Sequence, residues 1–219
     1  TPFQGNPLAV VFDADGLSDE AMQSIAAWTN LSETTFCLPA TEAGADYRVR
    51  IFTPRQELPF AGHPTIGTAH ALLEAGRITP KGGVLVQQCE AGLVRIEVDG
   101  DAAGRTLAFD LPKPTIRDLS DEEVGRLVSI LGAAPVEGVR PALVDVGARW
   151  VVVELPNAEA VIDLDPDYAA SAQFEKDLKV SGVTVFGAHG TGDAEIEVRS
   201  FAPSNTIDED PVCGSGNGS

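Results

Sequence analysis

The chain has 219 residues, of which 43% are hydrophobic and 22% charged, and 33 acidic against 15 basic residues give a net charge of −18. This is ordinary globular composition, and the length suits one large domain or two small ones. The acidic balance argues against a nucleic-acid or anionic-membrane partner. No apolar run approaches the ~18 residues that a membrane span needs.

The cysteines indicate the cellular setting. Cys37, Cys89 and Cys213 are too few and too scattered for a disulfide framework, so we expect a reducing, cytoplasmic environment. Because the chain opens at Thr1 without a methionine, we also expect a segment before it.

In the first half, short apolar or alternating segments predict strands over residues 8–12, 34–38, 47–52, 84–88, 93–98 and 106–111. Ser18 followed by two acidic residues is typical of a helix N-cap. Pro64 in a first turn and Gly76 just past an end predict a helix over residues 64–75.

A proline pair at Pro112 and Pro114 interrupts this pattern, and we place the domain boundary there, giving domains 1–112 and 113–219. The segment Ser120-Asp121-Glu122-Glu123 has the spacing of a capping box and predicts a helix after it. Further strands are expected over residues 142–146, 149–155, 183–186 and 195–201, with a helix over 167–178.

The two halves repeat each other. Residues 49–54 (VRIFTP) match 198–203 (VRSFAP) at an offset of 149. Residues 59–64 (PFAGHP) align with 211–216 (PVCGSG) if the second half is allowed three additional residues between the two segments. Upstream, Thr35-Phe36 aligns with Val185-Phe186 at an offset of 150. Because three matching segments occur in the same order in both halves, the sequence predicts an internal duplication. The alternative is that two strand-turn segments resemble each other by chance. The repeat also predicts a helix after Ser219.

A glycine-containing turn between a strand and a helix directs free backbone N–H groups at a ligand, and the helix dipole favours an anion there. We therefore expect Gly62 in the first turn, and Gly214 and Gly216 in the second, to bind an anion. One turn would hold a substrate carboxylate while the other stabilises developing negative charge. The alternative is that both are merely tight turns.

Several side chains near these turns could move protons. His63 stands at the first helix entrance, and Asp210 and Ser215 flank the second turn. Glu33 has no acidic counterpart in the repeat, where Val183 takes its place, so it is a candidate base; a solvated loop carboxylate is the alternative.

Cys213 is the thiol at the second predicted helix N-terminus, where its pKa should fall. No metal site is expected, because His63 and His70 are seven residues apart, without a neighbouring glutamate.

Five motifs, in the same order from end to end, resemble those of the PhzF-like phenazine-biosynthesis family: Phe3-Gln4-Gly5-Asn6-Pro7, Asn30-Leu31-Ser32-Glu33-Thr34, Arg50-Ile51-Phe52-Thr53-Pro54, Glu57 to Thr65, and Glu209-Asp210-Pro211 with Gly214-Ser215-Gly216. The resemblance implies an α/β (α+β) fold like that of diaminopimelate epimerase. In that fold two pseudo-symmetric domains each wrap a curved sheet around a central helix, with the active site between them. It also implies a strand before Thr1, a second central helix after Ser219, and a homodimer.

The same resemblance implies a function. The family's best-understood member isomerises trans-2,3-dihydro-3-hydroxyanthranilate without a cofactor. By motif, Glu33 resembles the acid/base that moves a proton between two substrate carbons, with His63, Asp210 and Ser215 as polar partners and Ser32 as a binding residue. We expect a cofactor-free isomerase of a small carboxylate-bearing substrate.

Two alternatives stay open. Epimerases and racemases of this fold use two cysteines, one at each helix entrance, and here those positions are Ala61 and Cys213. An epimerase, racemase or hydro-lyase of an amino-acid-like substrate that uses Cys213 is the first alternative. A non-catalytic, homodimeric small-molecule binding protein is the second, and it would not catalyse exchange of substrate hydrogen with solvent deuterium.

Overall fold

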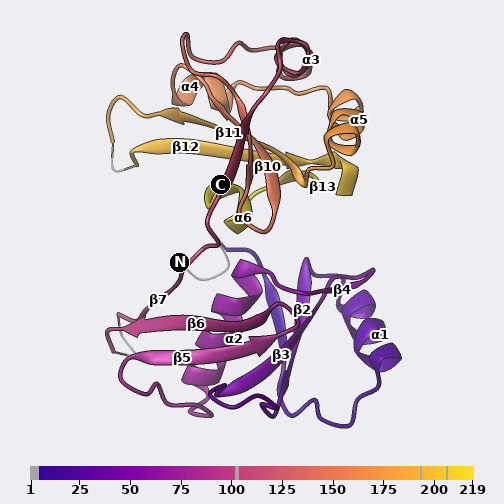
Figure 1. Ribbon diagram of the computed structural model, residues 1–219, viewed down its shortest axis with the longest axis vertical. Coiled ribbons are helices and arrows are strands. Elements are labelled where there is room, and N and C mark those ends of the chain that lie inside the picture. The colour runs from indigo at the N-terminus through magenta and orange to yellow at the C-terminus, as the bar shows by residue number, and fades with distance from the viewer. Residues whose placement is uncertain (1–4, 102–103, 193, 206) are drawn as a thin grey trace. The chain divides into compact units, whose positions relative to one another are not determined.

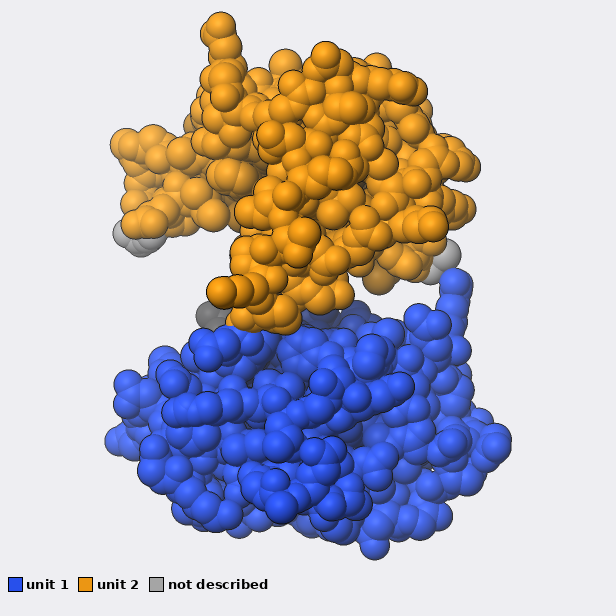
Figure 2. Space-filling model, viewed as in Figure 1, with its two compact units in different colours: residues 1–110 blue, residues 111–219 orange. Residues whose placement is uncertain are grey.

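The computed structural model describes residues 5–101, 104–192, 194–205 and 207–219, so Phe3 and Gln4 of the first motif lie outside the described residues. The chain divides into two compact units, residues 1–110 and 111–219 (Figure 2). Each unit has its own sheet and its own core. Within the described ranges, no helix is long and apolar enough to cross a membrane.

Unit 1 is a sheet curled around one helix (Figure 1). The strand order is β1-β2-β3-β5-β6-β7, with β4 paired to β3, and the helix α2 contacts β1 and β7 at the two ends of this order. The elements are β1 (Leu8–Val11), α1 (Asp19–Thr29), β2 (Glu33–Leu38), β3 (Tyr47–Phe52), β4 (Glu57–Leu58), α2 (Gly62–Glu74), β5 (Val84–Cys89), β6 (Gly92–Asp99) and β7 (Thr106–Phe109).

The alternation of β3 explains why the two helices lie on opposite faces of this sheet. Val49 and Ile51 are buried in one cluster with Leu72 of α2. Phe52 points the other way and packs in a second cluster with Met22 of α1. Successive strand residues face opposite sides, so the sheet buries both of its faces.

Unit 2 has the strand order β13-β12-β11-β10-β9-β8. Its core joins helices α3 and α5 to the sheet through Leu127, Phe174 and Phe201. The short helix α6 lies on the opposite face of the sheet, beside Thr184. The elements are β8 (Thr115–Asp118), α3 (Asp121–Leu131), β9 (Ala142–Asp145), β10 (Arg149–Glu154), α4 (Ala158–Ile162), α5 (Tyr168–Leu178), β11 (Gly182–Ala188), β12 (Ile196–Ala202), the 3-10 turn η1 (Pro203–Asn205), β13 (Ile207–Asp210) and α6 (Gly214–Asn217).

The predicted helix starts are confirmed in three of four cases. The Ser18 hydroxyl accepts the N–H of Ala21 at 3.2 Å, and Ser120 forms the full capping box with Glu123. The helix expected over 167–178 is α5, which begins directly after its N-cap Asp167. The remaining helix, α2, begins at Gly62 rather than Pro64.

Sequence analysis missed β4, β8, β13 and α4. β4 has only two residues, and β8 is exposed throughout, so neither carries an alternating apolar pattern. β13 reads Ile-Asp-Glu-Asp, a composition that strands usually avoid. α4 has five residues, too few for a helical period to show.

The strands that lead to α2 and to α6 are paired in the same way. β1 lies parallel to β2, β2 antiparallel to β3 and β3 antiparallel to β4; β10, β11, β12 and β13 repeat these pairings in this order. Thr34 is opposite Phe52, and Val183 is opposite Phe201, so Val183 corresponds to Thr34. The alignment of this strand at an offset of 150 was therefore wrong by one residue. The counterpart of Glu33 is Gly182, not Val183.

Candidate active site

Glu33 and His63 come together in unit 1 although they lie on different elements. Asn30 ends α1 in the left-handed conformation (φ 53°), which asparagine tolerates well, and the chain turns directly into β2 at Glu33. His63 is the second residue of α2. Glu33 Oε2 lies 3.2 Å from His63 Nδ1, and the side chains are 17% and 22% exposed.

These two side chains hold polar atoms without partners. Glu33 Oε2 and His63 Nε2 are both buried, and neither has a hydrogen-bond partner among the described residues. The approach of Glu33 to His63 Nδ1 is thus an ion-pair distance without the alignment of a hydrogen bond. Folding rarely leaves such atoms unpaired, because each costs about 1–3 kcal/mol. An acceptor and an imidazole nitrogen left free side by side are suited to a ligand with transferable protons.

A buried chain of hydrogen bonds fixes the start of α2. The Tyr47 hydroxyl donates to Gln87 Oε1 (3.0 Å), Gln87 Nε2 donates to Thr65 Oγ1 (2.9 Å), and Thr65 Oγ1 donates to the Ala61 carbonyl (2.9 Å). All three side chains are buried. Ala61 is the N-cap of α2 and offers no side-chain cap. These buried hydrogen bonds instead tie the first turn of α2, through Thr65, to β5 and β3.

Unit 2 holds the second set of expected residues around α6. Asp210 ends β13, and its Oδ1 accepts the N–H of Val212 at 3.1 Å. Ser215 is the second residue of α6, the place that His63 has in α2, and its hydroxyl accepts the indole N–H of Trp150 at 3.1 Å. Gly214, in the same turn, is exposed.

Gly216 is buried so tightly that a Cβ would meet the hydroxyls of Thr184 and Ser200 and the Cys213 sulfur. Its N–H donates to Cys213 Sγ at 3.3 Å. The Gly216 N–H is therefore already hydrogen-bonded within the protein and is not free to bind a ligand.

Cys213 is not the activated thiol that its helix position suggested. Burial raises the pKa of the Cys213 thiol above its ordinary value, and the expected decrease is wrong because desolvation outweighs the N–H contact from Gly216. The side chain is 5% exposed. It serves as the N-cap of α6, whereas its counterpart Ala61 caps nothing.

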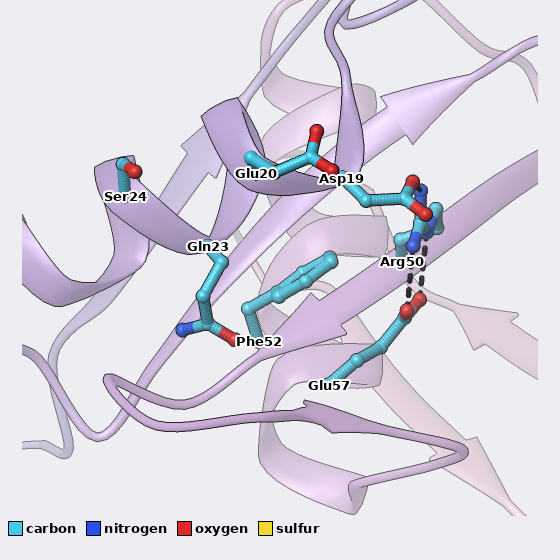
Figure 3. Close-up of a pocket in the computed structure, with 7 residues that line it drawn as sticks. All are labelled: Asp19, Glu20, Gln23, Ser24, Arg50, Phe52 and Glu57. Atoms are coloured by element: carbon cyan, nitrogen blue, oxygen red, sulfur yellow. Dashed lines mark hydrogen bonds and ion pairs between the residues drawn. The ribbon is translucent and has the colours of Figure 1, made fainter.

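A shallow pocket beside α1 is lined by charged groups, but its cation, Arg50, is already paired. Figure 3 shows Arg50 between Asp19 and Glu57. Arg50 Nε and Nη2 donate to the two oxygens of Glu57 at 2.7 and 2.6 Å, and Nη1 donates to Asp19 at 2.6 Å. This pairing ties β4 to β3 just before α2 begins.

Unit 2 contains the same tie. Arg199 Nε and Nη2 donate to the two oxygens of Glu209, both at 2.8 Å, and so hold β13 against β12 just before α6. Both units thus use an arginine and a glutamate joined by two hydrogen bonds at this place. We therefore interpret the charged residues of the Figure 3 pocket as structural, holding two neighbouring strands together.

The expected site residues thus form two groups, Glu33 with His63 and Gly62 in unit 1, and Asp210 with Ser215, Gly214 and Gly216 in unit 2. Ser32 is exposed and adjoins Glu33 in sequence. Sequence analysis missed Tyr47, Gln87 and Trp150, since buried polar contacts between distant strands leave no local pattern. Across the described residues, no group of three or more His, Cys, Asp or Glu side chains is arranged to hold a metal ion.

Comparison with known proteins identifies the family. Residues 1–219 match the family described as PhzC-PhzF, phenazine biosynthesis-like protein. The chain belongs to the PhzC-PhzF family. It is 47% identical over 220 residues to Antisense-enhancing sequence 1 of Schizosaccharomyces pombe, covering 99% of this chain and 74% of that protein.

Two further members of the PhzC-PhzF family bear on chemistry and fold. The chain is 37% identical to trans-2,3-dihydro-3-hydroxyanthranilate isomerase of Pseudomonas aeruginosa, covering 99% of this chain and 73% of that one. The crystal structure of a PhzF-family phenazine biosynthesis protein from Bacillus anthracis matches with a TM-score of 0.85 at 28% identity, over 98% of this chain and 72% of that one. The expected diaminopimelate epimerase-like fold is confirmed, and the chain is a PhzF-family isomerase.

Proposed function

We propose that this chain is a cofactor-free isomerase that moves a proton between two carbons of a small, carboxylate-bearing cyclic substrate of the trans-2,3-dihydro-3-hydroxyanthranilate type. The observation that carries the proposal is the pair of unpaired buried atoms, Glu33 Oε2 and His63 Nε2. The relatives named as isomerases of that compound support the substrate class.

In this mechanism Glu33 is the general base and then the general acid. Its carboxylate takes a proton from one substrate carbon and returns it to another, so the enzyme ends the cycle as it began. The neighbouring His63 nitrogen stabilises the negative charge that develops between the two transfers. Within unit 2, the resemblance of their motifs supports Asp210, Ser215 and the Gly214 amide as groups that bind the substrate's amine and carboxylate. Within unit 1 it supports the Gly62 amide and Ser32 as binding groups beside Glu33.

A thiol mechanism has weaker support. Cys213 is buried, its pKa is raised, and its N-cap counterpart is Ala61, so a pair of cysteines is not available. The homodimer and the cytoplasmic setting expected from the sequence stay predictions.

The test is isomerisation of trans-2,3-dihydro-3-hydroxyanthranilate in deuterium oxide, followed by proton NMR. We expect the wild type to form product. Deuterium at the protonated carbon measures how far the proton on Glu33 exchanges with solvent between the two transfers, and retained protium shows that the same proton is returned. Glu33→Gln keeps the size of the side chain but cannot accept a proton, so turnover should fall about 10²–10⁴-fold.

Glu90→Gln is the matched control, because Glu90 is exposed in the turn between β5 and β6. It should keep wild-type turnover. An unchanged rate in Glu33→Gln would remove Glu33 from the mechanism. Failure of the wild type to bind or turn over the compound would exclude this substrate class.

A further inference from the structure

Corresponding strand positions carry different residues in the two units. Glu33 is opposite Leu8 in the pairing of β2 with β1, and Gly182 is opposite Trp150 in the pairing of β11 with β10. Unit 1 thus has a carboxylate beside an aliphatic side chain. In unit 2 the corresponding position is a glycine, which has no side chain, beside the indole of Trp150.

Gly182 is required by the Phe201 backbone and by the indole together. A Cβ at position 182 would run into the Trp150 ring and the Phe201 carbonyl oxygen, so this position must be glycine for Trp150 to keep its place. Trp150 is 4% exposed and packs with Ala202 and Cys213 in the cluster beneath α6. The ring is therefore fixed by packing on several sides.

The indole makes one directed contact. Trp150 Nε1 lies 3.1 Å from Ser215 Oγ, and an indole nitrogen can only donate. Ser215 must therefore accept from Trp150, which leaves its own hydrogen free for another acceptor. Cys213 Sγ is 3.8 Å from the same hydroxyl, a weak alternative.

We propose that Trp150 is a positioning residue that fixes the Ser215 hydroxyl as a hydrogen-bond donor toward the substrate's carboxylate. In unit 1 the residue at the helix entrance, His63, lies beside the carboxylate of Glu33; in unit 2 its counterpart, Ser215, receives an N–H instead. The first arrangement suits proton transfer and the second suits anion binding. This inference rests on the proposed function, and its test separates the two.

The test is a double-mutant cycle on the binding of anthranilate, an unreactive aminocarboxylate, measured by calorimetry with Trp150→Phe, Ser215→Ala and the double variant. Because Trp150 acts only through Ser215, each single variant and the double variant should all bind about tenfold more weakly than the wild type. A purely structural tryptophan would give additive losses, about a hundredfold in the double variant. Additive losses, or no loss in Trp150→Phe, would overturn the proposal.

A second variant guards against a folding defect in Trp150→Phe. Replacing Trp150 with β-(3-benzothienyl)alanine keeps the shape of the ring and substitutes sulfur for the N–H. It should show the same tenfold loss. Wild-type affinity in this variant would contradict the proposal.

A ligand-free measurement tests the contact itself. The chain has two tryptophans, and Trp28 is 84% exposed, so Trp28→Phe leaves Trp150 as the sole indole N–H signal in a ¹⁵N-correlated NMR spectrum. Ser215→Ala should move this signal and speed its exchange with solvent. An unmoved signal would exclude the hydrogen bond.

The outcomes distinguish this inference from the proposed function. Normal isomerisation with additive binding losses would reject the role of Trp150 and keep the isomerase. Coupled losses of anthranilate binding in a protein that does not isomerise the dihydro compound would keep the role of Trp150 and reject that substrate. No anthranilate binding by the wild type would reject the carboxylate site and the role of Trp150 with it.

Discussion

Glu33 Oε2 and His63 Nδ1 are 3.2 Å apart, yet the carboxylate oxygen is buried without a hydrogen bond to any described residue. A group in this condition lowers stability, because it has lost its water and gained no hydrogen bond in exchange. Such a cost is expected where a side chain is kept for chemistry.

Glu33→Leu should therefore make the protein more stable while abolishing turnover. Removing the unpaired oxygen should raise the unfolding free energy by about 1 kcal/mol, or roughly 2–4 °C in melting temperature. Differential scanning calorimetry of the variant and of Glu90→Leu, where no gain is expected, checks this. A melting temperature lowered by several degrees would mean that Glu33 is paired in the folded protein.

Cys213→Ser should keep at least half of the wild-type turnover. A serine hydroxyl can still accept the Gly216 N–H and cap α6, and the proposed proton transfer does not use the thiol. Steady-state kinetics measure the effect, and a loss of roughly 10³-fold or more would restore a thiol mechanism. The wild-type thiol should also react slowly with iodoacetamide at pH 8, since burial raises its pKa.

Tyr47→Phe should lower the unfolding free energy by about 1–2 kcal/mol, because it leaves the buried Gln87 Oε1 without its donor. Tyr168→Phe is the matched control: Tyr168 is the other tyrosine, and its hydroxyl makes no hydrogen bond to a described residue. That variant should cost less than about 0.5 kcal/mol. Equal effects in urea denaturation would show that the chain from Tyr47 to Ala61 does not support α2.

The capping box of α3 should make stability depend on acid pH. The ion pair with Arg117 and the N–H of Ser120 lower the pKa of Glu123 from its ordinary 4.5 to about 2. A lowered pKa in the folded state stabilises the fold above pH 4.5, and this contribution is lost as the pH falls toward 2.

Glu123→Gln should therefore cost about 1 kcal/mol at pH 6, and much less near pH 2.5. Glu122→Gln, one residue earlier in the same turn and exposed, should show no such pH dependence. Thermal unfolding between pH 2.5 and 6 measures both. A cost of Glu123→Gln that does not shrink in acid would contradict the assignment.

Helices and strands were predictable where buried and exposed residues alternate regularly along the sequence. Strand β3 was expected over residues 47–52 and has these bounds, because its apolar residues alternate with two arginines. Ser18 and Ser120 were identifiable as caps because their partners are close in sequence. The edge strands β8 and β13 were not, because they bury little and carry polar residues.

The site was partly predictable for the same physical reason. Glu33 and His63 stand in local motifs, but their approach depends on how β2 and α2 pack, which no local pattern shows. The one-residue error beside Glu33 arose because Phe36 and Phe186 resemble each other, whereas the pairing of each strand with its neighbour sets the true register. Trp150 gave no functional signal, since a tryptophan in a strand usually signifies core packing.

The glycine at position 182 also limits how the two halves can evolve. A carboxylate there would collide with the Trp150 ring and with the backbone of Phe201. A carboxylate at position 182 thus requires both loss of the indole and movement of β12 at Phe201. A designed two-carboxylate variant therefore has to change positions 150 and 182 and also make room in the β12 backbone.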